Sequence, residues 1–268
     1  AACQTELPEG CLINGIITNE AELTATLQGF FAANELPTQR VALAAGGSQF
    51  NHRVLTLPRM SEKKRAAVLT REFSTGGADV TAPLDDYMLL STDKKTKADT
   101  VLATRVESAV IETYINLAAA CGLKLYSIDL ALAGQIKLVG ATPALAGQSF
   151  VVLQFDGDSL IAGLYEEGQY KYSTRSRLFN PRGTQASGTE IGQKLSGLIQ
   201  FQTAAKSEHP ITAVYFGGST PADLAACAPA CQALRLDAAE YPETVNVKLP
   251  EGVKLADVAL AAGNLIGR

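Results

Sequence analysis

The sequence predicts an α/β protein, in which strands and helices alternate along the chain. The clearest support is the stretch 101–138, which has the pattern of a strand, a helix, a second strand and a second helix. Two further apolar strands, 149–155 and 211–216, each run directly into a turn that contains glycine. A length of 268 residues with 47% apolar residues is sufficient for one large domain or two lobes with a substantial core.

The first 60 residues predict a turn, a helix and two strands. Asn14-Gly15 is a tight-turn dipeptide, and Asn19 is placed to cap a helix over 20–33. A buried strand is expected over 40–44. The side chains of 49–58 alternate and predict a second strand, which ends at a proline.

The next elements are expected to complete a small subdomain. A helix capped by Ser61 runs to Phe73, a loop covers 75–79, a strand covers 86–90, and 93–97 forms a charged hairpin turn. Together with the strand at 40–44 and the elements up to 128, these predict one compact α+β unit with two helices on one face of a sheet.

The helix over 107–120 carries its apolar side chains at helical spacing. Gly122 supplies the left-handed residue that closes it, and a strand over 123–128 follows. Asp129 is expected to be the N-cap of the next helix. The apolar side chains are those of Val110, Ile111, Tyr114, Leu117 and Ala118.

The second half of the chain predicts three strands, a helix, a fourth strand and two helices. The strands are 149–155, 160–165 and 170–176, and the first two are joined by an acidic turn at 156–159. Gly188 is expected to open a helix that runs to about 207. Pro221 opens the helix after the strand 211–216, and the last helix covers 255–266.

Charge and motif content exclude several functions. The net charge of −4 argues against binding to nucleic acid, which needs a basic face. No window reaches the ~20 apolar residues of a membrane span, and the start does not have the pattern of a secretory signal. Neither a nucleophile elbow nor a Walker loop occurs, so no catalytic residue is predicted.

The cysteines predict buried thiols and no metal site. The five cysteines are scattered, and neither they nor the two histidines match a metal-ligand spacing. Cys227 and Cys231 are therefore expected to be free and buried or half-buried, as in a reducing cytoplasm.

Four short motifs resemble the PilM family of type IV pilus assembly proteins, an actin-like group related to FtsA. They are Ala-Cys-Gly-Leu followed by Ile-Asp-Leu over 120–130, the segment Gly15 to Asn19, the pattern R-x-L-x-L-P-x-M-S over 53–61, and the ending A-L-A-A-G-N-L-I-G-R over 259–268. The resemblance covers nearly the whole chain.

The resemblance implies an actin-like (ribonuclease H-like) fold of two lobes. The first lobe would cover 1–128, with an inserted FtsA/PilM-type α+β subdomain at about 41–128, and the second would cover 129–268. The chain begins downstream of the position at which such proteins carry their first phosphate-loop hairpin. ATP hydrolysis is therefore expected to be weak or absent.

The resemblance also implies ATP and Mg²⁺ contacts at three places in the second lobe. The acidic turn would be the second phosphate loop, although the position two before its glycine is Phe155 rather than aspartate. An ordinary acidic turn and an ordinary strand-to-helix turn are the alternatives for the first two places. The implied residues are Asp156, Gly157, Asp158 and Ser159 in the first place, Gly217, Gly218 and Ser219 in the second, and Glu190 and Lys194 in the third.

The function that the resemblance implies is a cytoplasmic scaffold at the inner face of the cytoplasmic membrane. Family members bind the cytoplasmic tail of the membrane protein PilN, and the secretion ATPase is a further expected partner. The implied groove between the lobe core and the inserted subdomain maps to Val41, Leu43, Arg53, Leu55 and Leu57. The alternatives are an active actin-like ATPase and a cytoplasmic component of type II secretion or cell division.

Overall fold

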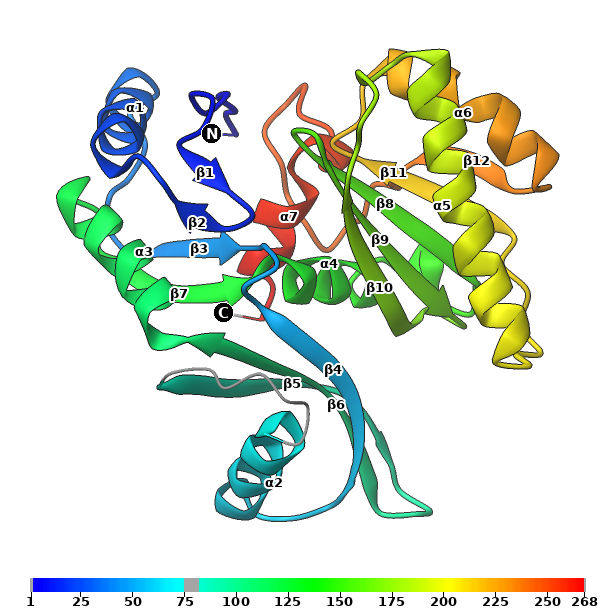
Figure 1. The fold of residues 1–268 in the computed structure, drawn as a ribbon. Helices are drawn as coiled ribbons and strands as arrows, with labels where there is room; N and C mark the ends of the chain where they lie inside the picture. Colours follow the sequence, from blue (N-terminus) through cyan, green and yellow to red (C-terminus); the bar gives the residue numbers. More distant parts are fainter. Residues whose placement is uncertain (1, 75–81, 268) are drawn as a thin grey trace. The chain divides into compact units, whose positions relative to one another are not determined.

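The computed structural model describes residues 2–74 and 82–267, and the chain divides into two compact units, Cys3–Ala133 and Gly134–Arg268 (Figure 1). The loop expected over 75–79 lies outside the described residues. The lobe boundaries implied by the resemblance stay a prediction, and each unit is described below by itself.

Unit 1 begins with the predicted turn and capped helix. Strands β1 (Leu12–Ile13) and β2 (Ile16–Ile17) form a hairpin, in which both Asn14 and Gly15 have positive φ. Helix α1 (Glu20–Ala33) follows, and the side chain of Asn19 accepts a hydrogen bond from the backbone N–H of Glu22 at 3.3 Å. Both local predictions are confirmed.

A two-stranded parallel sheet forms the centre of unit 1. Strand β3 (Val41–Ala45), which is half-buried for most of its length, pairs with β7 (Leu125–Leu130), and α3 (Ser108–Ala120) packs beside them. The hydroxyl of Tyr114 on α3 donates to the carbonyl of Gly15 at 2.8 Å. The predicted N-cap is wrong, because Asp129 pairs with Ala44 inside β7 and α4 (Ala131–Gly140) starts after it.

A second sheet in unit 1 is antiparallel and has the order β4-β6-β5. Its strands are β4 (Asn51–Pro58), β5 (Pro83–Asp93) and β6 (Ala98–Glu107), and α2 (Glu62–Ser74) packs on one face through Leu69 and Phe73. Residues 41–128 therefore do not form the predicted single sheet with two helices on one face. Strands β3 and β7 belong to the other sheet, since their backbones pair with each other.

The two sheets of unit 1 meet at one apolar cluster, here called the junction cluster. Its buried members come from the ends of β3 and β6, from α3 and from the residue before β4. Half-buried aliphatic side chains surround them. The buried members are Ala45, Phe50, Val106 and Tyr114, and the half-buried ones are Ile17, Leu43, Val110, Ile111, Ile128 and Leu130.

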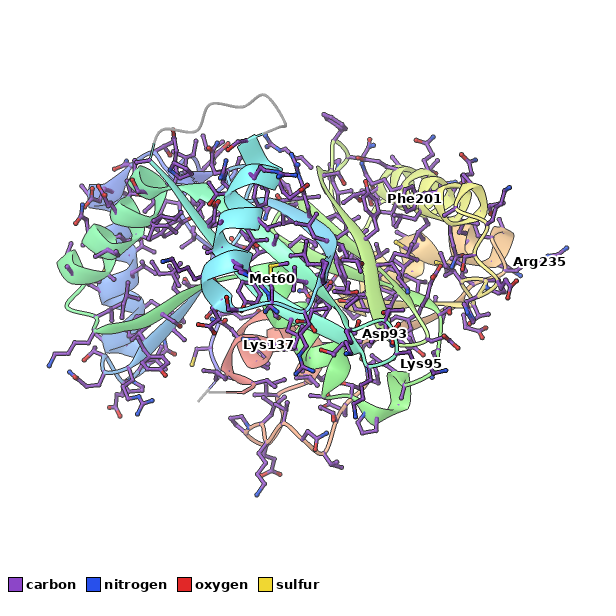
Figure 2. All side chains as sticks on the ribbon, turned by 90° about the horizontal axis from the view of Figure 1, so that it is seen from below. Met60, Asp93, Lys95, Lys137, Phe201 and Arg235 are labelled. Atoms are coloured by element: carbon purple, nitrogen blue, oxygen red, sulfur yellow. The ribbon has the colours of Figure 1, made fainter. Side chains whose placement is uncertain are left out.

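The charged turn predicted over 93–97 closes the β5–β6 hairpin. Figure 2 shows Asp93 and Lys95 together at its tip. The carboxylate of Asp93 accepts hydrogen bonds from the backbone N–H groups of Lys95 and Thr96, at 2.7 and 3.3 Å.

Unit 2 is built on a five-stranded sheet of order β10-β9-β8-β11-β12. Helices α5 (Gln185–Ala204) and α6 (Pro221–Ala233) cover one face, where Leu195 and Cys227 belong to the same buried core as Leu153. Helix α4 and α7 (Leu255–Leu265) lie on the other face, as the hydrogen bond from the Tyr165 hydroxyl to Gln135 shows for α4. The strands are β8 (Phe150–Asp156), β9 (Ser159–Glu166), β10 (Gln169–Arg177), β11 (Ala213–Gly217) and β12 (Asp237–Glu240).

Two features of unit 2 differ from the prediction. Strand β12 was not expected. Helix α5 begins one turn before Gly188, because Thr184 and Ser187 cap it reciprocally through side chain and backbone.

Candidate functional site

The acidic turn forms a two-residue hairpin loop at the end of β8. Asp156 pairs with Ser159, and Gly157 has a φ of +54° with open space where a Cβ would stand. The carboxylates of Asp156 and Asp158 lie 3.5 and 3.7 Å from guanidinium nitrogens of two β10 arginines and are 57% and 65% exposed. Exposed pairs of this kind are weak, but they pair arginines with the two carboxylates that were expected to act through a metal ion.

The second predicted place lies at the end of β11, which runs parallel to β8. Gly217 is opposite Gln154, and Gly218 has a φ of +63°. A Cβ on Gly218 would stand 2.5 Å from the carbonyl oxygen of Phe155. The group that approaches Gly218 closely is therefore the chain's own backbone, and the ligand contact implied by the resemblance stays a prediction.

Two polar atoms at this turn are buried and have no hydrogen-bond partner among the described residues. They are Oε1 of Gln154 and Oγ of Ser219. The amide nitrogen of Gln154 donates to the carbonyl of Phe155 at 3.1 Å, and its oxygen stands 2.3 Å from where a Cβ of Gly217 would be. Any side chain at Gly217 would therefore displace the buried amide.

Arg182 joins the hairpin and the glycine turn, and the sequence predictions missed it. One guanidinium nitrogen donates to the carbonyl of Gly157 at 3.4 Å, and the other donates to the carbonyl of Gly218 at 2.8 Å. The same group pairs with Asp223 at 2.5 Å and lies 4.4 Å from the centre of the Phe155 ring. No local signal marks this arginine, because its partners are distant in the sequence.

Asp223 is the buried partner of this arginine. Its side chain is 1% exposed and also accepts hydrogen bonds from the N–H and hydroxyl of Thr220, both at 2.8 Å, at the start of α6. Burial raises the pKa of Asp223, but the hydrogen bonds from Arg182 and Thr220 outweigh it and leave the pKa below the ordinary value. The carboxylate is therefore held in its charged form.

Glu190 holds the loop that carries Arg182, and Lys194 pairs with Glu190 on the same helix. The Glu190 carboxylate accepts from the N–H groups of Phe179 and Asn180 at 3.1 and 3.2 Å, and Lys194 pairs with it at 3.5 Å. Burial raises the pKa of Glu190, but these hydrogen bonds, together with one from the Asn180 amide, leave it lowered. The Glu190 carboxylate is thus engaged in fixing the segment before α5.

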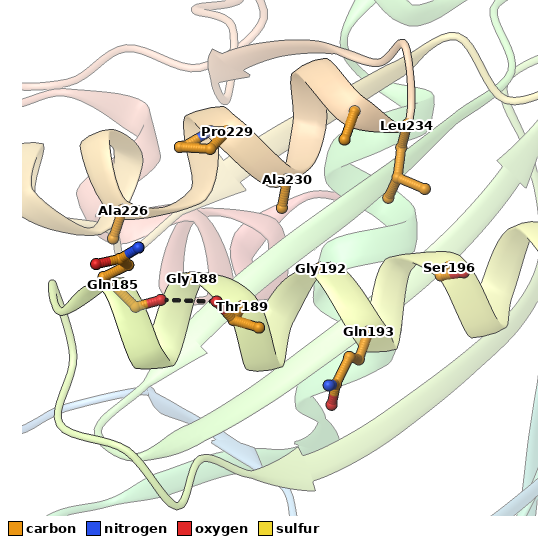
Figure 3. A pocket seen from close by; sticks show the side chains of 11 residues that line it. Gln185, Gly188, Thr189, Gly192, Gln193, Ser196, Ala226, Pro229, Ala230 and Leu234 are labelled. Carbon is orange, nitrogen blue, oxygen red and sulfur yellow. Dashed lines mark hydrogen bonds between the residues drawn. The ribbon is translucent and has the colours of Figure 1, made fainter.

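A groove of about 420 Å³ lies between α5 and α6 and is lined mainly by small residues (Figure 3). Gly188 and Gly192 on α5 lie against Ala226 and Ala230 on α6. A Cβ on Gly188 would stand 1.9 Å from the carbonyl oxygen of Ala226, so the two backbones are in direct contact. This groove is separate from the Arg182 contacts.

The structure thus brings the hairpin 156–159 and the turn 217–219 to one edge of the sheet. Glu190 binds the connecting loop, and Lys194 pairs with Glu190. No group of three or more His, Cys, Asp or Glu side chains suited to a metal ion occurs within residues 2–74 and 82–267.

The five residues expected to bind a partner are divided between two cores. Leu43 belongs to the junction cluster, whereas Leu55 and Leu57 pack against α2. Arg53 donates to the carbonyl of Glu72 at 2.9 Å, and its guanidinium lies over the Phe73 ring. Val41 lies at the start of β3 and is half-buried.

In the part of the chain that the structure describes, none of the helices combines the length and apolar character needed to cross a bilayer. The predicted burial of the thiols is confirmed: Cys11, Cys227 and Cys231 are buried, and Cys3 and Cys121 are half-buried.

Neither protein-family models nor curated proteins give a match to the sequence. Solved structures do match. A structure of the PilM–PilN type IV pilus biogenesis complex is 16% identical, with a TM-score of 0.77 over 96% of this chain and 87% of that chain. A Bacteroides thetaiotaomicron protein of unknown function with an actin-like ATPase fold is 12% identical, with a TM-score of 0.50 over 89% of this chain and 80% of that chain. The chain therefore has an actin-like fold, in the form that the PilM–PilN complex shows over nearly all of this chain.

Proposed function

We propose that this protein is a scaffold that binds the cytoplasmic tail of an inner-membrane partner in a type IV pilus or related secretion machine. The observation that carries the proposal is the match to the PilM–PilN complex, which extends over 96% of the chain with a TM-score of 0.77. The proposed location is the cytoplasmic face of the inner membrane.

The junction cluster is the proposed docking surface for the tail. It presents half-buried aliphatic side chains from β3, α3 and β7, which suit the apolar anchors of an extended peptide. Of the residues implied by the resemblance, Leu43 is a member of the junction cluster. Leu55 and Leu57 are already covered by α2, so their substitution would unpack that helix before it tested binding.

The test measures the affinity of a fluorescent peptide that carries the cytoplasmic segment of the organism's PilN-like protein. Leu43→Ala is expected to weaken binding about tenfold, equivalent to about 1.4 kcal/mol. Leu27→Ala is the matched control, because Leu27 is also a half-buried leucine of unit 1 but packs in a different cluster.

Both substitutions are expected to cost similar stability, roughly 2 kcal/mol, so urea denaturation of each variant separates folding from binding. Equal affinities for the two variants would place the tail elsewhere. Binding of a type II secretion tail in preference to the pilus tail would assign the protein to that machine.

A second candidate function is nucleotide binding at unit 2. It is favoured by the adjacency of the hairpin 156–159 and the turn 217–219, with Gly217 paired opposite Gln154 of β8, whereas the hydrogen bonds of Arg182 to both turns count against it. Titration with ATP, with and without Mg²⁺, followed by calorimetry and phosphate release tests it. Saturable binding with turnover would favour an ATPase, and saturable binding without turnover would favour a scaffold that retains a ligand.

A further inference from the structure

The place where the hairpin, the glycine turn and α6 meet is lined by hydrogen-bond acceptors. The carbonyl oxygens of Gly157 and Gly218 and the carboxylate of Asp223 all receive hydrogen bonds from Arg182. Three acceptors around one point create a negative potential, which favours a cation and opposes a phosphate group. The guanidinium fits because it is planar and donates in several directions at once.

The arginine also fits the surface by its shape. Its guanidinium lies on the ring of Phe155, a side chain that is 4% exposed, and its own side chain is 25% exposed. Because the Asp223 carboxylate is almost fully buried, removing its charged partner would leave it uncompensated. The contact is thus more than an exposed ion pair.

The loop that carries Arg182 is fixed at both ends. At its start the N–H of Leu178 donates to the carbonyl of Asp158 at 2.7 Å, and Glu190 binds the next two N–H groups. At its end a Cβ on Gly183 would stand 2.8 Å from the Cβ of Ala222 on α6. These contacts therefore hold the guanidinium in one position.

We propose that the side chain of Arg182, rather than a nucleotide, occupies the place at the ends of β8 and β11 where nucleotide phosphates were expected. The set of Arg182, Asp223 and the carbonyls of Gly157 and Gly218, here called the Arg182 clamp, fixes the hairpin, the glycine turn and the start of α6 without a bound nucleotide. This role is independent of tail binding by unit 1.

Hydrogen exchange on the full chain tests the clamp. Arg182→Ala is expected to increase amide exchange roughly tenfold or more in both 156–159 and 217–223. Arg177→Ala is the matched control, because it removes an arginine that pairs with the same hairpin but is 74% exposed, and it is expected to leave 217–223 unchanged. Methylguanidinium added to Arg182→Ala is expected to restore protection in both segments.

A second variant and a ligand complete the test. Arg182→Lys keeps the charge but loses the planar fork, so it is expected to fold and to show intermediate protection from exchange. This variant replaces Arg182→Ala in the test if Arg182→Ala does not fold. Exchange in the wild type is expected to be insensitive to ATP, with or without Mg²⁺. Protection of 156–159 and 217–219 by ATP in the wild type, or unchanged exchange in either segment of Arg182→Ala, would overturn the proposal.

Discussion

Two buried arginine–aspartate pairs fasten α2 and β5 to β6 in unit 1. Arg65 pairs with Asp99 at 2.5 Å, with both side chains at most 10% exposed. Arg105 reaches both carboxylate oxygens of Asp85, at 2.6 and 2.8 Å, and also donates to the carbonyl of Thr70 on α2. The pair between Arg105 and Asp85 is bidentate, and such a pair fixes geometry as well as charge.

The pair between Arg105 and Asp85 predicts an acid-sensitive unit 1. The hydrogen bonds from Arg105 lower the pKa of Asp85, so its contribution to stability is complete above the unfolded-state value of about 3.9 and is lost as the pH falls through the folded-state value. Asp85→Asn is expected to lose about 2–3 kcal/mol at pH 7 and to approach the wild type below about pH 4.

Urea denaturation of unit 1 across this pH range is the measurement. Asp86→Asn is the control, since Asp86 is the exposed neighbour on the same strand. A gap between the wild type and Asp85→Asn that stays constant with pH would show that the carboxylate charge does not contribute.

The buried thiols predict a two-step reaction with Ellman's reagent. Burial, with the nearby Cys231 and Asp223, raises the pKa of Cys227 to about 12, so little thiolate forms at pH 8. The half-buried Cys3 and Cys121 are expected to react first, and the buried three only as unit 1 or unit 2 opens. Fast labelling of Cys227 in the native protein would contradict its place in the core.

At the scale of elements, the contact between α5 and α6 leaves no room for a side chain at Gly188. Small residues recur every four positions on both helices, and Figure 3 shows the two helices side by side. Such spacing keeps one face of each helix free of bulky side chains and lets the backbones touch. The start of α6 is thereby held against the start of α5.

Gly188 and Gly197, both on α5, make a matched pair for this contact. Gly197→Ala is expected to stabilise unit 2 by roughly 0.5–1 kcal/mol, because its Cβ meets open space and alanine favours the helix. Gly188→Ala is expected to destabilise it by about 1–3 kcal/mol or more, because its Cβ would overlap the Ala226 carbonyl. Thermal unfolding of both variants checks the opposite signs.

Element by element, the sequence predicted what depends on neighbours along the chain. Asn14-Gly15 and Asn19 act within a few residues and were recognised. Asp129 has the chemistry of an N-cap, but pairing with Ala44 draws it into a strand. Strand β12 has the sequence Asp-Ala-Ala-Glu, which favours no strand, and forms because β11 offers it a partner.

The candidate site was less predictable for the same reason. The glycine turn and the hairpin were recognised from their composition. Arg182 was not, since it meets Gly218 and Asp223, which lie 36 and 41 residues further along the chain. Patterns among neighbouring residues do not indicate contacts between residues that are far apart in the sequence.

At the scale of the whole molecule, each unit has its own core and its own proposed role. Unit 1 has the junction cluster, which is proposed to receive a tail, and unit 2 has the Arg182 clamp. A ligand that binds one unit is therefore expected to change hydrogen exchange in that unit alone.

This predicts where hydrogen exchange will respond to the PilN-like peptide. Amides of β3, α3 and β7 are expected to gain protection because the junction cluster comes from these elements, whereas β8 to β12 are expected to be unchanged. At about 100 times the dissociation constant the bound state gains roughly 2.7 kcal/mol, enough to be seen clearly. Protection confined to unit 2 would assign the tail to the other half of the protein.

The loop before α5 has a practical consequence. Phe179 is 88% exposed, three residues before Arg182, while its backbone N–H is bound by Glu190. Since the chain contains no tryptophan, Phe179→Trp would introduce a single indole whose emission belongs to this loop alone. Fluorescence anisotropy and quenching of this indole would then report the mobility of the loop before α5 without an added label.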